Sequence, residues 1–95
     1  MHDWALSSIS VDWEAGTATI SLSWASRPAA IVAHGIRDLR IPRKFEWGPS
    51  VSVNRTRGPD PVEDGLLSFS IEMQSGDTIE IIATRFDLPA SRAQN

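Results

Sequence analysis

The sequence has no cysteine, only two histidines, and Lys44 as its single lysine. Without cysteine there can be no disulfide, no thiolate metal site and no cysteine nucleophile. His2 and His34 are too few and too far apart to suggest zinc, which needs three or four ligands from histidine, cysteine and carboxylates. The chain also lacks the Gly-x-x-x-x-Gly-Lys phosphate loop and the Gly-x-Ser-x-Gly motif of many hydrolases. We therefore expect a protein that is not an enzyme, with no catalytic residue, no metal and no cofactor.

Long apolar runs are missing as well. A long uncharged stretch, residues 16–26, alternates polar and apolar side chains and is too short to cross a bilayer. The N-terminal residues show neither the basic segment nor the apolar run of a secretory signal. The net charge of −3 disfavours nucleic-acid binding, which usually requires a basic excess. These features predict a cytoplasmic protein that binds neither a membrane nor a nucleic acid.

What the chain does contain is a two-residue alternation of apolar and polar side chains, the pattern of half-buried β-strands. The alternation is clearest over residues 6–13 and 17–24, and again over residues 67–73 and 78–86. Each pair of segments flanks a short turn that contains glycine, so each pair predicts a β-hairpin. We expect Trp13 and Trp24 to end the apolar faces of the first hairpin. The predicted common core consists of Ile20, Leu22, Phe69, Ile71, Ile79 and Ile81.

The middle of the chain is less regular. Residues 29–34 predict a third strand, with a bent continuation over residues 36–41 beyond a glycine. Residues 50–55 predict a fourth strand after a loop at residues 43–48. Residues 56–65 are rich in glycine and proline and have the composition of an exposed loop. Together with the two hairpins, these segments give six predicted strands.

Six evenly spaced strands and no amphipathic helix predict an all-β fold, an antiparallel six-stranded meander that forms a small sandwich or barrel. Ninety-five residues suit a single domain, which we assign to residues 1–89. Residues 90–95 have no large apolar side chain and are expected to form a disordered tail. A free sandwich edge could also pair two copies into a homodimer. The sequence leaves open whether that edge is the one at Ser7 or the one at Ala29.

A local basic cluster provides the candidate binding site. Arginine carries nearly all the positive charge, and arginine suits bidentate pairing and stacking at protein interfaces. The tryptophan beside the cluster could anchor an interface. Arg55 and Arg57 follow the cluster shortly after, and the cluster could meet an acidic partner or RNA. The alternative is structural: the charges would protect a strand edge from unwanted pairing, and the tryptophan would cap one end of the sandwich. The predicted partner-binding residues are Arg37, Arg40, Arg43, Lys44 and Trp47.

Two other functions remain open from the residues alone. The tryptophans could stack on a sugar or another small ligand, if one of them lies exposed in a groove. His34 could serve an enzyme as a base, if a pocket holds it within hydrogen-bond reach of a carboxylate. A structural or solvent-exposed role for His34 is the favoured interpretation.

Three segments resemble a family of short, uncharacterised bacterial β proteins. They are Val11-Asp12-Trp13-Glu14, residues 47–54 (Trp-Gly-Pro-Ser-Val-Ser-Val-Asn) and residues 71–77 (Ile-Glu-Met-Gln-Ser-Gly-Asp). Some similar proteins are regarded as immunity proteins of polymorphic toxin systems, which bind and neutralise a partner toxin. The resemblance extends over residues 4–88 and implies a non-enzymatic protein-binding module. It supplies no catalytic residues.

Overall fold

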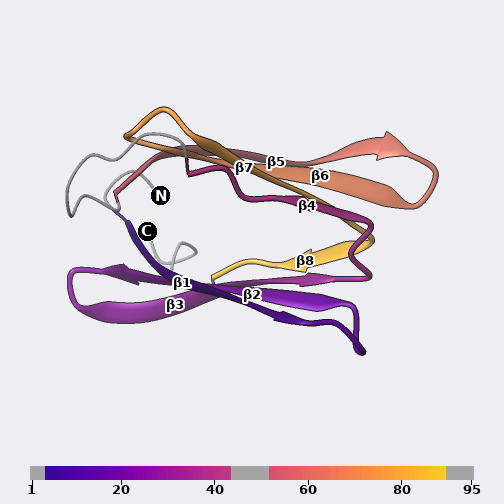
Figure 1. Ribbon diagram of the computed structural model, residues 1–95, viewed down its shortest axis with the longest axis horizontal. Helices are drawn as coiled ribbons and strands as arrows, with labels where there is room; N and C mark the ends of the chain where they lie inside the picture. The colour runs from indigo at the N-terminus through magenta and orange to yellow at the C-terminus, as the bar shows by residue number, and fades with distance from the viewer. Residues whose placement is uncertain (1–3, 44–51, 90–95) are drawn as a thin grey trace.

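Two antiparallel four-stranded sheets pack face to face in the computed structural model (Figure 1), which describes residues 4–43 and 52–89. No helix occurs in these two ranges. The first sheet has the order β1-β2-β3-β8. Its strands are β1 (Ala5–Asp12), β2 (Thr17–Trp24), β3 (Arg27–His34) and β8 (Arg85–Asp87). The second sheet has the order β4-β7-β6-β5. Its strands are β4 (Asp38–Arg40), β5 (Val53–Glu63), β6 (Leu66–Met73) and β7 (Thr78–Ala83).

The described part of the chain forms eight strands instead of the predicted six, because two long segments pass from one sheet to the other. The first bends at Gly35, whose φ of 67° favours glycine, and continues from β3 into β4. The second bends at Thr84, between β7 and β8. The two segments stay paired at this corner, where the Thr84 backbone N–H donates to the His34 carbonyl at 2.9 Å. The predicted bent continuation after the glycine is confirmed, whereas the prediction of one unbroken strand over residues 78–86 is wrong.

The strand order also corrects the predicted meander. In a meander each strand pairs with the next one along the chain, but here β3 pairs with β8, and β4 pairs with β7. On the opposite side of the molecule, β1 and β5 approach at an isolated bridge between Ala5 and Ser52. The backbone N–H of Val53 also donates to the Trp4 carbonyl at 2.8 Å. Because this contact is an isolated bridge and not a continuous ladder, the two sheets form a sandwich and not a closed barrel.

The largest error of the sequence analysis concerns residues 56–65, which were expected to form a loop. Most of this segment belongs to β5, which runs through Pro59 and Pro61 to Glu63. Proline is tolerated here because β5 is the edge strand of the second sheet, so one side of its backbone needs no hydrogen-bond partner. The pairing register shifts between Arg57 and Asp60, and again before Glu63. Such bulges let the strand accommodate residues that a regular ladder excludes.

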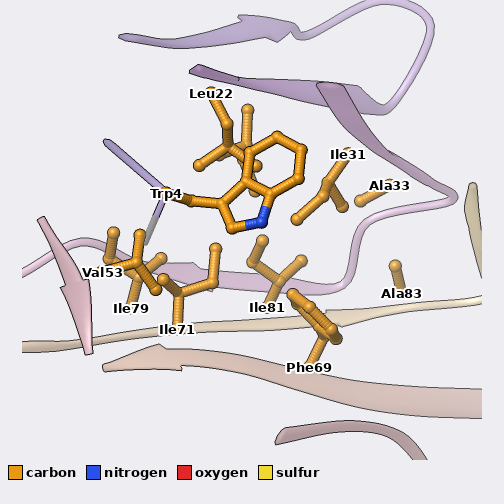
Figure 2. Close-up of a cluster of buried hydrophobic side chains, with 11 residues drawn as sticks. Trp4, Leu22, Ile31, Ala33, Val53, Phe69, Ile71, Ile79, Ile81 and Ala83 are labelled. Carbon is orange, nitrogen blue, oxygen red and sulfur yellow. The ribbon is translucent and has the colours of Figure 1, made fainter. Parts of the chain in front are cut away.

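The core lies between the two sheets, and side chains from both point into it (Figure 2). All six predicted core residues are at most 2% exposed. Phe69 of the second sheet contacts Phe86 of the first, with ring centroids 5.5 Å apart. Trp4 is also buried, and its ring stacks on Trp24 at a centroid distance of 6.2 Å. The two-residue alternation thus identified the central core correctly.

The alternation fails at the ends of the first hairpin. Trp13, expected on the inner face, is 91% exposed. β1 ends at Asp12, whose carbonyl accepts a hydrogen bond from the Gly16 N–H at 2.9 Å, so Trp13 belongs to the turn. Trp24 is 43% exposed and covers Trp4 from outside. Alternation predicts the face of a residue only while the strand continues, and it does not show where the strand ends.

Candidate functional site: the charged face of the second sheet

The five predicted partner-binding residues do not form one surface of described residues. Arg37 is exposed in the link that precedes β4, and Arg43 is exposed beyond the end of β4. Arg40 is in β4 itself. Lys44 and Trp47 lie outside the described residues.

Strand pairing places Arg40 in line with residues from the three other strands of the second sheet. Arg40 is opposite Glu80 of β7, Glu80 is opposite Ser70 of β6, and Ser70 is opposite Arg57 of β5. This row crosses the whole second sheet. Its members point outward because their neighbours along the strands, such as Ile81 and Phe69, point into the core.

A second row runs beside the first, from Thr78 of β7 through Glu72 of β6 to Arg55 of β5. We call the two rows together the charged face. It consists of Arg40, Arg55, Arg57, Ser70, Glu72, Thr78 and Glu80.

The charged face is hollowed at two adjoining places. A hollow of about 280 Å³ is lined by Arg55, Thr56, Arg57, Ser70, Glu72, Thr78 and Glu80. A wider one of about 590 Å³ is lined by Arg40, Ile41, Pro42, Gly76, Asp77, Thr78 and Glu80. Because Thr78 and Glu80 line both, the two hollows form one continuous depression across the face.

The charges on this face are only partly neutralised by one another. Arg55 Nε donates to Glu72 Oε1 at 2.7 Å, and Arg40 Nε donates to Asp38 Oδ2 at 3.0 Å. Within residues 4–43 and 52–89, Arg57 and Glu80 have no ion pair, and both are exposed. Two strand spacings separate them, roughly 10 Å. The face can therefore receive an anion at Arg57 and a cation at Glu80, with the Ser70 hydroxyl between them.

A smaller polar cluster lies on the outer face of the first sheet, where His34 Nε2 is 2.9 Å from Asp87 Oδ2. Arg85 Nη2 is 3.6 Å from the same oxygen. The hydrogen bond with His34 is the main cause that lowers the pKa of Asp87, and the charge of Arg85 contributes. A carboxylate is thus within reach of His34, as the enzyme hypothesis required. Neither side chain lines the depression of the charged face.

The sequence analysis did not assign Arg55, Arg57, Glu72 and Glu80 to the site. The outward parity of Glu72 and Glu80 could be derived from the alternation in residues 67–73 and 78–86. That of Arg55 and Arg57 could not, because Arg57 was expected in a loop and the register of β5 shifts between Val53 and Arg55. What the alternation could not supply was the order of the strands. Arg40 and Arg57 are 17 positions apart in the sequence, and two intervening strands, β7 and β6, bring them into one row.

Within the described part of the chain, no helix has the length and hydrophobicity to span a bilayer. Comparison with family models gave no match for this sequence, and neither the curated proteins nor the solved structures gave a significant match.

Proposed function

We propose that the protein is a non-enzymatic binding module whose charged face contacts a protein partner. The observation that carries this proposal is the pair of exposed charges at Arg57 and Glu80. Both line a depression, and neither has an ion pair among the described residues. Fixed charges of both signs on a sheet favour a partner with complementary charges, because such complementarity speeds association and rejects wrong partners.

The mixture of signs favours a protein over a nucleic acid. Glu72 and Glu80 would repel phosphates at the same surface that offers Arg57. A small apolar ligand is also a poor fit at Arg57 and Glu80. Ligand pockets are concave and mostly apolar, whereas this part of the depression is lined by charged and hydroxyl side chains.

The specific partner that we propose is a bacterial toxin in the cytoplasm, which the protein would neutralise as an immunity protein. The support for this is the resemblance of residues 11–14, 47–54 and 71–77 to that family. An immunity protein needs a binding surface and no catalytic groups, and the charged face fits that requirement.

The test compares capture of a partner by tagged wild-type protein and by two variants, using lysate of the source organism. The double variant R57E/E80K reverses both unpaired charges of the face. The matched control, R85E, reverses an exposed arginine on the other sheet. We expect one specific protein to bind the wild type and R85E, and to bind R57E/E80K about tenfold or more weakly once purified, which corresponds to 1.4 kcal/mol. Equal binding by all three proteins would exclude the charged face as the site.

A second candidate function rests on Trp13, which is 91% exposed in the turn between β1 and β2. An aromatic ring in this position can stack on a sugar. The turn is held in shape, since Asp12 Oδ1 accepts a hydrogen bond from the Ala15 N–H at 3.1 Å. Tryptophan fluorescence that changes with one member of a glycan panel in the wild type, but not in W13A, would support this function. No response to any glycan would count against it.

A further inference from the structure

Among residues 4–43 and 52–89 the two sheets end in four edge strands, and three of these carry features that prevent pairing with another strand. β5 contains two prolines and four charged residues. β4 and β8 have three residues each, two of them charged. β1 differs, since it has eight residues, no proline and a single charge, Asp12, at its end. A long uncharged edge presents unpaired backbone N–H and C=O groups, to which another strand can add.

The open part of this edge lies toward the end of β1. Its beginning is occupied by the bridge from Ala5 to Ser52 and by a bulge at Ser7. Beyond the bulge, Ser8, Ser10 and Asp12 are exposed, and Val11 is 48% exposed. A strand that paired here would therefore cover apolar surface as well as satisfy backbone groups.

We propose that a second copy of this chain pairs with β1, antiparallel and about a two-fold axis at Ile9. The two first sheets then become one continuous sheet across the dimer. In this register Ile9 faces Ile9 of the second copy, and Ser8 faces Ser10. The regular ladder ends at Ser8 and Ser10 on each side of the axis, because Ser7 lies in the bulge.

The residues of β1 favour a second copy over an unrelated strand. The stretch around Ile9 is self-complementary, with serine on both sides, so the symmetry brings hydroxyl against hydroxyl and one β-branched side chain against another. The one charge of the strand, Asp12, lies beyond this short ladder and meets no like charge within it. The pairing uses the edge of the first sheet, so it leaves the charged face of the second sheet free and does not depend on the proposed function.

The experiment measures the molar mass of the full chain by sedimentation equilibrium over a range of concentrations. The variant S8K/S10K sets lysine against lysine at two places across the axis. The matched control, T19K/S21K, adds the same charges on the same outer face. Thr19 and Ser21 belong to β2, which is not an edge strand, and they pair with Ser10 and Ser8 of β1. We expect a dimer for the wild type and for the control, and a dissociation constant at least tenfold higher for S8K/S10K.

A charge-complementation experiment separates edge pairing from a general effect of added charge. S8E/S10E should dissociate as S8K/S10K does, and an equimolar mixture of the two should form a heterodimer. A wild type that is monomeric at every concentration would overturn the proposal. So would an S8K/S10K variant that remains a dimer, a control that dissociates equally, or a mixture that fails to associate. Circular dichroism of each variant confirms that the sheets are intact.

Discussion

The outer faces of the two sheets are built on the same alternation but carry different chemistry. The first sheet presents mainly hydroxyl side chains along β1 and β2, namely Ser8, Ser10, Thr17, Thr19, Ser21 and Ser23. The second sheet presents the charged face. Hydroxyl groups are readily solvated, whereas fixed charges of both signs can select a partner. The difference shows that alternation decides which residues face water, and that side-chain chemistry decides what each face can bind.

The two outer faces also differ in how far their charged side chains form ion pairs with one another. On the first sheet, His34 and Arg85 both approach Asp87, so that the carboxylate already has two partners. On the second sheet, Arg55 pairs with Glu72, while Arg57 has no ion pair among the described residues. The capacity for a new ionic contact is therefore greater on the charged face.

The largest effect on stability is expected in the core that the two sheets share. Phe69 is 1% exposed and contacts Phe86 across the sandwich. F69A should lower the free energy of unfolding by about 3–5 kcal/mol, because it removes buried contacts and leaves a cavity. Urea denaturation followed by tryptophan fluorescence measures the change. The control S70A, an adjacent residue of the charged face, should change stability by no more than about 0.5 kcal/mol. Similar losses in both variants would contradict the division into an inner and an outer surface.

A smaller effect is expected at the corner that connects the sheets. Gly35 has a φ of 67°, and an added Cβ would overlap the hydroxyl of Thr84. Gly16 has a similar φ of 70°, but nothing lies within 4 Å of the position of its Cβ. G16A should therefore report backbone strain alone, whereas G35A adds the overlap. We expect a loss of about 1 kcal/mol for G16A and about 2–3 kcal/mol for G35A, measured by thermal denaturation. Equal losses would mean that Thr84 moves aside without cost.

The smallest effect concerns the polar cluster of the first sheet. The pKa of Asp87 lies below its ordinary value of 3.8, mainly because of the hydrogen bond with His34. A lowered folded-state pKa means that the carboxylate stabilises the folded protein above the ordinary value. The contribution disappears as the pH falls through the folded-state pKa. The stability difference between wild type and D87N should thus shrink as the pH falls from about 5 to about 2. The carboxyl carbon shift of Asp87 gives the pKa directly by NMR titration, and a midpoint at or above 3.8 would refute the prediction.

Much of the fold could be predicted because local pattern and tertiary burial agree at the centre of each hairpin. Ile20 and Phe69 lie on strands that are apolar at every second position, and both are buried. Prediction failed at the edge strand β5, because an edge strand tolerates proline where a central strand does not. Pro59 and Pro61 have the composition of a loop, yet an edge strand with bulges includes them. It failed also at Trp13, which the alternation placed on the inner face although β1 ends at Asp12 and Trp13 lies in the turn.

The candidate site was predictable only in part. Arg40 was identified from local charge density, but Arg57 and Glu80 join it through strand pairing across the second sheet. The edge at β1 was one of two alternatives left by the sequence. In the structure β1 is an edge strand of the first sheet, whereas β3, which contains Ala29, pairs with β2 along its length and with β8 at Val32, Ala33 and His34.

By itself, the sequence determined the all-β class, the parity of the strands and the identity of the central core, because a two-residue period and the burial of apolar side chains are local properties. The tertiary structure alone decided the corners at Gly35 and Thr84, the order of strands in each sheet and the composition of the charged face. These depend on which segments pair over long separations along the chain. Local alternation is the same for every possible pairing, so it carries no information on that choice.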